Sequence, residues 1–496
     1  MKIKVTQKLL PYFTPVLVIK EGESIERHSL FQKLPLTDKH HLKAFVKHAS
    51  IRSDANHVVF LPSGVAALVL GVVKKSKFTH RKSMLLMRRI VAVGRKERQS
   101  GLTLDINDFV AVDRKMHLEA LSEILATQCV MANFDFVQYK TPPRDGWFFV
   151  DQISVFANGS FSNKLGAALE RGKIIGEEIN QARILSNTPG GDMTPQKLGE
   201  AAVLAGRRTG FRVKILKEQD LRKLKMGGIL GVSKGSSEKP RFIIMEYLKG
   251  MRSERPVVIV GKGVTFDTGG LNLKPTDSIY EMHMDMSGGA ATIHIMSSLA
   301  RLKVKKNIIG LVPAVENMPS GSSYRPGDVL KTMSGKTIEV LNTDAEGRII
   351  LADALTYANR YKPKLVVDIA TLTGAAIVAL GYRASAFFSN SEEVGKRLCE
   401  SGEIVGDLIW PLPLWEEYED DVKGTFGDVA NTGKTRYGGA INGAVFLWQF
   451  IKDIGSPSWV HLDIAPRMTS IDGEYLTKGA LGASVGLLVH FIRFRN

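Results

Sequence analysis

Two carboxylates and a guanidinium alternate along the segment 342–348, which reads NTDAEGR. In an extended segment, Asp344, Glu346 and Arg348 would point the same way. Two acids on one face repel each other unless a cation lies between them, and a hard divalent metal ion is the usual cation for oxygen ligands. For an isolated pattern of this kind a surface ion pair is the commoner explanation, so the metal hypothesis depends on residues upstream.

Further acids lie in two loop-like segments earlier in the chain. The apolar, β-branched run 257–260 is typical of a buried strand, and the glycine-rich stretch 261–275 after it indicates a loop at the strand's C-terminal end. Open α/β sheets carry their chemistry at that end. Asp267 lies in this loop, and Asp285 precedes a small-residue segment, 288–302, that favours a helix.

The acids from these segments would together carry four negative charges, which two divalent cations would neutralise. A neutral cluster costs less to bury than a charged one. Lys262 and Lys274 are either counter-charges or, where cations crowd them, neutral nitrogen ligands. We assign Lys262 as a ligand and Lys274 as the retained cation. The four acids are Asp267, Asp285, Asp344 and Glu346.

The blocks VGKGVTFDTGGLNLKP, MDMSGGAA and NTDAEGR closely resemble the leucyl (cytosol-type, M17) aminopeptidase family, and the similarity runs from about Arg183 to the C-terminus. The resemblance implies a two-metal exopeptidase in which Lys274 and Arg348 are catalytic and bind no metal. It implies two divalent ions per subunit, Mn²⁺ or Zn²⁺ with Mg²⁺ as an option in one site, and bicarbonate held by Arg348. One metal would be bound by Asp267, Asp344 and Glu346, and the other by Lys262, Asp267, Asp285 and Glu346.

The same resemblance implies a pocket for the side chain of the substrate's first residue. Because methionine gives a pocket an adaptable apolar wall, we expect Leu and Met to be preferred there over Asp or Glu. Pro466 and Arg467 stand where the family usually has glycine, and an Arg467 turned into the pocket would reverse that preference. The expected pocket residues are Met282, Asn342, Thr371, Leu372, Gly374, Ala465 and Met468.

Rival motifs are weaker. The sequence around Lys262 lacks the glycine and the Ser or Thr of a phosphate-binding loop. His283, His294 and His461 show no zinc-ligand spacing and are expected in the core or on the surface. A different two-metal hydrolase, such as a phosphatase, stays open as an alternative.

Composition indicates an enzyme of the cytoplasm. The chain has 496 residues, 44% of them hydrophobic, and can bury a large core. Its two cysteines, Cys129 and Cys399, are too few for a disulfide framework and fit a reducing compartment. The basic N-terminus followed by prolines favours a first strand over an export signal, and no apolar stretch is long enough for a membrane span. The resemblance implies a homohexamer acting on short peptides.

The net charge of +17 is concentrated in residues 1–150, which hold 24 Lys and Arg against 13 Asp and Glu. A basic cluster could bind nucleic acid electrostatically, and some members of the family bind DNA, so DNA binding is kept as an alternative function. Solvated helix faces explain the same charges more simply, because no nucleic-acid motif accompanies them. The cluster consists of Lys74, Lys75, Lys77, Arg81, Lys82, Arg88, Arg89, Arg95, Lys96 and Arg98.

Short apolar runs alternate with helical stretches along the whole chain. This pattern predicts an α/β fold with a smaller N-terminal α/β domain at residues 1–160, a linking helix at 161–186 and a catalytic domain at 187–496. In the catalytic domain we expect a mixed, largely parallel sheet flanked by helices. Strands are predicted near residues 16–19, 58–61, 148–150, 212–215, 242–245, 257–260, 308–312, 365–369 and 460–464.

Overall fold

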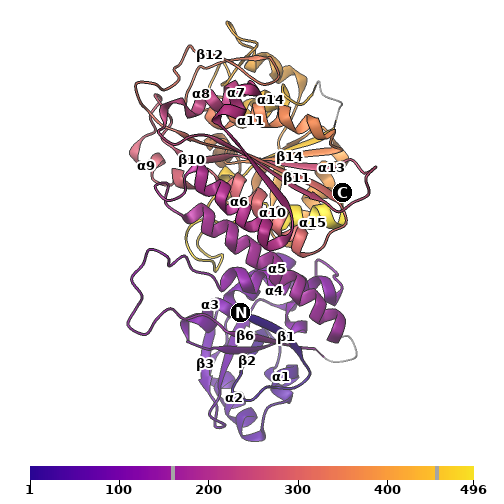
Figure 1. Ribbon diagram of the computed structural model, residues 1–496. Coiled ribbons are helices and arrows are strands. Elements are labelled where there is room, and N and C mark those ends of the chain that lie inside the picture. The colour runs from indigo at the N-terminus through magenta and orange to yellow at the C-terminus, as the bar shows by residue number, and fades with distance from the viewer. Residues whose placement is uncertain (158–161, 453–456, 496) are drawn as a thin grey trace. The chain divides into compact units, whose positions relative to one another are not determined.

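The computed structural model describes residues 1–157, 162–452 and 457–495, which form two compact units (Figure 1). Unit 1 comprises Met1–Glu177 and Ile471–Thr477, and unit 2 comprises Glu178–Ser470 and Lys478–Asn496. Both units combine sheets with helices, which confirms the predicted α/β class. The predicted domain limits at 160 and 186 stay a prediction. Helix α5 (Ser162–Asn187) begins just after the first limit and ends just after the second.

Unit 1 is built on a six-stranded sheet in the order β1-β6-β5-β2-β4-β3. Neighbouring strands are parallel except for β3, which pairs antiparallel with β4 at one edge. The predicted strand at 148–150 is wrong, because that apolar run lies in a loop just before β6. The strands are β1 (Lys2–Thr6), β2 (Thr14–Lys20), β3 (Asn56–Phe60), β4 (Ala66–Val72), β5 (Gly101–Asp105) and β6 (Gln152–Phe156), and the helices are α1 (Ser29–Gln32), α2 (Leu36–Ala49), α3 (His80–Lys96) and α4 (Leu118–Ala132).

Three arginines of the basic cluster face the interior of unit 1. Arg89 is 6% exposed and donates to the carbonyl oxygens of Ala55 (2.6 Å) and Gly71 (2.9 Å). Arg88 donates to the Gln128 side chain and half-buried Arg95 to main-chain oxygens, so all three satisfy groups of the fold itself. The surface part of the cluster is therefore smaller than the sequence suggests.

Unit 2 contains a nine-stranded mixed sheet whose central strands are parallel. Its main path is β16-β15-β18-β14-β9-β11-β8-β7, and β10 adds to β11. β15 runs antiparallel to β18, and β8 runs antiparallel to both β11 and β7. The strands are β7 (Arg212–Lys217), β8 (Arg241–Leu248), β9 (Val257–Gly261), β10 (Gly263–Asp267), β11 (Asn307–Asn317), β14 (Leu365–Ala370), β15 (Ser385–Ser389), β16 (Ile409–Pro411) and β18 (Ser458–Asp463).

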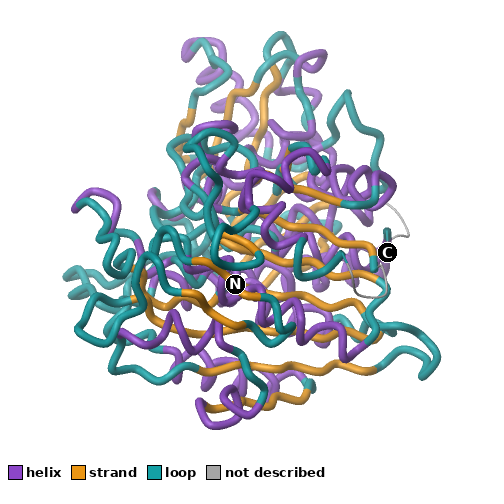
Figure 2. The backbone as a smooth tube through the Cα atoms, turned by 90° about the horizontal axis from the view of Figure 1, so that it is seen from above, coloured by secondary structure: helices purple, strands orange, loops and turns teal. Residues whose placement is uncertain are grey.

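Helices cover both faces of this sheet, as Figures 1 and 2 show. On one face lie α6 (Pro195–Thr209), α10 (Ser287–Arg301) and α15 (Val485–Phe494), and on the other α8 (Gly227–Val232), α11 (Glu346–Ala358) and α14 (Gly439–Trp448). Unit 2 also contains α7 (Glu218–Lys223), α9 (Thr276–Ile279), α12 (Gly374–Leu380), α13 (Glu392–Val405), several short 3-10 helices and a small sheet of β12 (Val329–Lys331), β13 (Thr337–Glu339) and β17 (Val429–Ala430).

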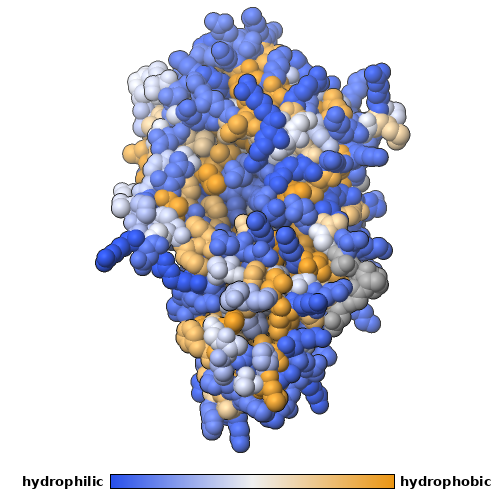
Figure 3. All heavy atoms as spheres, turned by 60° about the horizontal axis from the view of Figure 1, so that its bottom comes forward, coloured by the Kyte–Doolittle hydropathy of each residue, from blue (hydrophilic) through white to orange (hydrophobic). Residues whose placement is uncertain are grey.

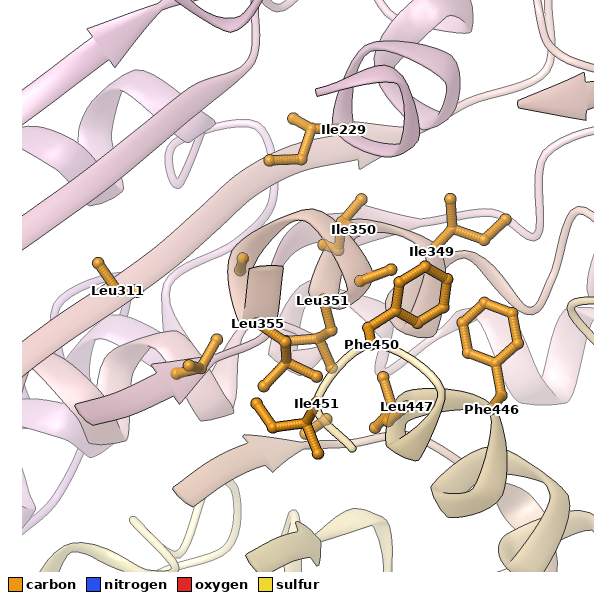
Figure 4. Packing of buried hydrophobic residues seen from close by; sticks show 14 of the residues in the cluster. Ile229, Leu311, Ile349, Ile350, Leu351, Leu355, Phe446, Leu447, Phe450 and Ile451 are labelled. Carbon is orange, nitrogen blue, oxygen red and sulfur yellow. The ribbon is translucent and has the colours of Figure 1, made fainter. Parts of the chain in front are cut away.

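The core beneath α11 and α14 holds these two helices against the sheet. Fully buried Ile, Leu and Phe side chains from both helices interdigitate with the strands (Figure 4). Burial of each such side chain contributes roughly 1.5–3 kcal/mol, so the start of α11 is held firmly. Figure 4 labels Ile349, Ile350, Leu351 and Leu355 of α11, Phe446 and Leu447 of α14, Phe450 and Ile451 just after α14, Ile229 of α8 and Leu311 of β11.

Helix α10 begins against the ends of two central strands, and glycine permits this approach. A Cβ atom on Gly288 would lie 2.1 Å from the carbonyl oxygen of Ile369, far closer than atoms can approach.

Hydrophilic side chains dominate the face drawn in Figure 3. Among the described residues, no helix is both long and apolar enough to cross a membrane.

Candidate active site

The site residues lie where several strands of unit 2 end. Lys262 follows β9, Asp267 is the last residue of β10, and Asp285 comes just before α10. The N–H of Lys262 donates to the carbonyl of Ile369 on parallel strand β14 (2.9 Å), which ties the ends of the two strands together. Open α/β sheets bind ligands at this edge.

The segment 342–348 is not extended, so the geometry expected from its alternate spacing is wrong. Asp344 lies in a turn, where its N–H donates to the Asn342 side chain (2.8 Å), and Glu346 is the first residue of α11. The apolar residues that follow form a helix because their side chains fill the core described above. The turn still brings both acids to the same place, and the helix N-terminus favours the charge of Glu346.

Oxygen atoms of Asp267, Asp344 and Glu346 all lie within 4.8 Å of one another. Lys274 joins two of these acids, since its Nζ lies 2.8 Å from Asp267 Oδ2 and also contacts Asp344 Oδ1. Lys262 joins the third to Asp285, with Nζ 2.8 Å from Glu346 Oε1 and 2.8 Å from Asp285 Oδ2. Sequence reasoning therefore named acids and lysines that do meet in one cluster.

Burial is the main cause that raises the pKa values of three of the four acids in this cluster. Burial and the neighbouring Glu346 raise the pKa of Asp267 to about 6, against the opposing effect of the lysines. Burial also raises the pKa of Asp285 well above its ordinary value and raises that of Asp344. Burial would raise the pKa of Glu346 too, but Lys262 and Lys274 together hold it below its ordinary value.

Both lysines keep their protons in this arrangement. Burial lowers the pKa of each ammonium, but the surrounding carboxylates outweigh it, so the pKa values of Lys262 and Lys274 lie above their ordinary range. Lys262 also donates to the carbonyl oxygen of Thr371 (2.9 Å). Gly347 leaves the space that the Lys262 side chain fills, because a Cβ there would lie 2.6 Å from Lys262 Cε.

Arg348 lies two residues after Glu346 in the first turn of α11, and its side chain lines a cavity. It is 7% exposed, its Nη1 donates to the carbonyl of Asn431 (2.9 Å), and burial lowers its pKa to about 10. Together with Asn342 it lines a cavity of about 420 Å³. Arg348 is thus placed to meet an anion beside the acid cluster.

The expected pocket residues after β14 and β18 are connected through one buried acid. The N–H groups of Leu372 and Ala465 both donate to Asp463 Oδ1, at 3.0 and 3.2 Å. Thr371 is tied to the acid cluster, because its hydroxyl donates to Asp285 Oδ1 (2.6 Å). Gly374 is the exposed first residue of α12, which contacts the turn Ala465–Arg467.

The two methionines of the expected pocket are half-buried, Met282 in the turn before Asp285 and Met468 after the turn that begins at Ala465. Arg467 is 4% exposed and donates to the carbonyl of Tyr382 (2.6 Å). Its guanidinium is therefore engaged by the main chain.

Three histidines considered as zinc ligands, His283, His294 and His461, lie outside the acid cluster. His294 pairs with Glu178 (2.8 Å) and His461 with Asp368 (2.5 Å), and both histidines are buried. His283 is half-buried, and burial lowers its pKa.

Two buried asparagines that position the site were missed by sequence reasoning. Asn317, the last residue of β11, donates from Nδ2 to Asp267 Oδ1 (2.8 Å) and to the carbonyl of Thr343 (2.9 Å). Asn431 accepts from the N–H of Leu341 (2.7 Å) and donates to the carbonyl of Asn342 (2.6 Å). The predicted strand at 308–312 ends before Asn317, so the sequence carried no signal for either asparagine.

Residues 180–489 match the model of the cytosol aminopeptidase family, catalytic domain. The chain is 47% identical over 341 residues to a probable cytosol aminopeptidase of Azoarcus sp. (strain BH72), covering 69% of this chain and 67% of that one. It is 37% identical over 427 residues to another of Geobacter sp. (strain M21), covering 86% and 85%. Among solved structures, the bottromycin maturation enzyme BotP in complex with Mn is similar, with a TM-score of 0.83, 28% identity and coverage of 97% of this chain and 98% of that one.

Proposed function

Because this chain belongs to the cytosol aminopeptidase family and is an aminopeptidase, we propose that it uses two divalent metal ions to release N-terminal Leu and other apolar residues from short peptides. The observation that carries the proposal is the convergence of Asp267, Asp344 and Glu346 oxygens within 4.8 Å. Acids placed so closely repel one another, and a bound cation would relieve that repulsion.

The residues present fit divalent cations. Four acids face two lysine ammonium groups, which leaves an excess of negative charge, and buried Glu346 Oε2 has no hydrogen-bond partner within the described part of the chain. Carboxylate oxygens suit Mn²⁺ and Zn²⁺. The Lys262 nitrogen could serve as a ligand once two bound cations displace its proton. We propose Asp267, Asp344 and Glu346 for one ion, and Lys262, Asp267, Asp285 and Glu346 for the other.

When bound, such ions polarise a carbonyl and lower the pKa of water. The chain itself contributes two positively charged side chains, Lys274 and Arg348, held at fixed positions. Lys274 stays protonated beside Asp267 and Asp344, so it can stabilise negative charge that develops on the substrate's carbonyl oxygen. Arg348, buried at the edge of the cavity, is suited to hold a small anion such as bicarbonate.

The surroundings of the expected pocket support a preference for an apolar residue at the substrate's N-terminus. The loops at Leu372 and Ala465 are held together by Asp463, whose carboxylate is occupied by main-chain N–H groups. Arg467 is only 4% exposed and donates to the carbonyl of Tyr382, so its guanidinium is held against the main chain. We therefore propose a preference for Leu and Met over Asp and Glu.

The proposal is tested by measuring the rate of leucine amide hydrolysis before and after a chelator removes bound metal, and again after Mn²⁺ or Zn²⁺ is added back. Glu346→Ala should lose activity by at least about a thousandfold while keeping its melting transition, because one residue would serve both ions. Glu393→Ala, which removes an exposed acid of α13, is the matched control. Full activity of Glu346→Ala with two metals still bound would refute the mechanism, and turnover of a phosphate ester instead would favour a phosphatase.

A homohexamer acting in the cytoplasm completes the proposal. The relatives carry the name cytosol aminopeptidase, and a closed assembly would admit short peptides while sparing folded proteins. We keep DNA binding by unit 1 as the alternative function. Charge reversal at exposed Lys75 and Lys77 should abolish salt-sensitive duplex binding if that alternative holds, whereas peptidase activity should not change.

A further inference from the structure

The cavity beside Arg348 is bordered by more positive charge than a single small anion needs. Its volume is about 420 Å³, and Lys434 and Arg436 line it together with Arg348, Asn342 and Asn442. Ligand pockets begin at about 300 Å³, so the space is large enough for an amino-acid residue. No acidic residue is among the described residues that line it.

The floor of this cavity is rigid. Asn431 joins the turn at Asn342 to the loop that follows β17, by donating to the Asn342 carbonyl (2.6 Å) and accepting from the Leu341 N–H (2.7 Å). Arg348 is fixed to the same residue through its carbonyl (2.9 Å). The cavity is therefore built on the segment that carries Asp344 and Glu346.

Two buried polar atoms in the lining lack partners. Arg348 Nε and Asn442 Oδ1 make no hydrogen bond within the described residues, although their side chains belong to residues only 7% and 2% exposed. Buried polar atoms are nearly always paired with protein, water or a ligand. Both atoms are shielded from solvent, so the polar groups that an occupant of the cavity would meet are the exposed ones of the lining.

The cations at the rim are available to such an occupant. Lys434 and Arg436 are both exposed, and neither forms an ion pair with any acid in the part of the chain that the structure describes. The Arg436 guanidinium lies over the ring of Tyr437, 5.4 Å from its centroid, which limits the positions that it can take. An occupant with a negative charge is favoured.

We propose that this cavity is a subsite for a carboxylate of the peptide substrate beyond the bond that is cut, with Lys434 and Arg436 as specificity-determining residues. The inference rests on the proposed function, because the peptide would reach the cavity with its N-terminus at the acid cluster. Loops at Leu372 and Ala465 would hold the first side chain, whereas Arg348 and Asn342 lead to this cavity. The carboxylate is either an acidic second side chain or the C-terminus of a dipeptide.

Two pairs of substrates test the proposal on the full-length, metal-loaded protein. Leu-Asp-amide is compared with Leu-Asn-amide, and the dipeptide Leu-Gly with Leu-Gly-amide, each at low and high salt. We expect the charged member of at least one pair to have a kcat/KM about two- to fivefold higher, mainly through KM, since an exposed ion pair contributes an effect of this size. The difference in kcat/KM should shrink at 1 M salt, where the Debye length is only about 3 Å.

The double variant Lys434→Gln, Arg436→Gln should bring both ratios close to one. Lys396→Gln, which removes an exposed lysine of α13, should leave them as in the parent protein. The first pair reports on an acidic side chain and the second on a C-terminus, so the source of the carboxylate is read directly. Ratios within twofold of one in the parent, or ratios unchanged in the double variant, would overturn the subsite alone. Absence of turnover for all four peptides would overturn the proposed function and the subsite with it.

Discussion

Asn317 donates a hydrogen bond from its side-chain amide to Asp267 Oδ1 at a distance of 2.8 Å, and Asp267 Oδ2 faces Lys274 Nζ at the same distance. One oxygen of this carboxylate is thus oriented by an amide at the end of β11. The other is left to the charged groups of the site. Asn317 is completely buried and acts through Asp267, as a positioning residue.

Replacing Asn317 by Ala should lower metal affinity and kcat/KM by about 10- to 100-fold, because residues that orient ligands have effects of this size. Metal titration followed by peptidase assay measures both. Asn307→Ala is the matched control, since Asn307 lies at the other end of β11 and also donates to main-chain carbonyls. An Asn317→Ala protein with unchanged metal affinity would show that the amide has only a structural role.

Gly347→Ala should displace Lys262, because the added Cβ would lie 2.6 Å from Cε and 2.8 Å from Nζ. Activity on leucine amide should fall by about a hundredfold or more, as expected when a site residue moves by about 1 Å. Gly166→Ala, at a helix position with open space, should be tolerated or stabilising by up to about 1 kcal/mol. Equal activity in the two variants would contradict this role for Gly347.

Lys274→Ala and Arg348→Ala should lower kcat while metal content stays near that of the parent, if these residues act on the transition state. Metal analysis alongside steady-state kinetics separates the two effects. Removal of bicarbonate should slow the parent protein more than the Arg348 variant. Loss of metal in proportion to loss of activity would instead make both residues counter-charges for the acids.

The buried carboxylate of Glu178 should give unit 2 an acid-sensitive stability. It accepts from Arg208 and Arg301 at 2.8 Å and pairs with His294 at 2.8 Å. Burial raises its pKa, but these partners outweigh burial and hold the pKa below the ordinary 4.5. The stabilisation is therefore present above pH 4.5 and is lost as the pH falls through the lower, folded-state pKa.

Glu178→Gln should reduce the free energy of unfolding at pH 7 by about 3–5 kcal/mol, because it leaves buried cationic groups without their partner. Chemical denaturation between pH 3 and 7 should show a flatter pH profile for this variant than for the parent protein. Glu393→Gln, in an exposed pair with Arg397, should change stability by less than about 1 kcal/mol. An unaltered pH profile in Glu178→Gln would refute the assignment.

Light scattering at physiological salt should give a mass near six times the 54.5 kDa chain. The expectation comes from the proposed homohexamer, whose enclosed sites would admit only short peptides. Dilution in the presence of substrate would show whether activity follows the assembly. A monomer with full activity would exclude assembly as a requirement.

The acids and lysines of the site could be predicted from sequence because charged residues in glycine-rich loops after apolar strands have few structural roles. Their conformation was harder to predict. The alternation of Asp344 and Glu346 suggested an extended segment, but the apolar residues after Glu346 gain more by packing as α11 against the core. Asn317 and Asn431 escaped prediction because an asparagine is recognised as a positioning residue only when its partners, distant in sequence, are known.

The basic cluster of unit 1 could not be resolved into buried and exposed residues from the sequence. A count of charged residues includes Arg88, Arg89 and Arg95, yet these arginines donate to groups from other elements of unit 1. Nothing local distinguishes them from Lys75 or Lys77, which are exposed. Tertiary contacts decide which charges a partner molecule can meet.

The return of the chain to unit 1 at Ile471–Thr477 affects the order in which the protein is completed during translation. Thr477 donates from its hydroxyl to the carbonyl of Phe134 (2.6 Å), within unit 1. The ribosome must add roughly 300 residues after Glu177 before this contact can form, which takes on the order of 15–60 s at about 5–20 residues per second. The first unit to emerge is therefore still incomplete when almost the whole chain has been synthesised, and a fragment that stops at Glu177 would lack a segment of its own unit.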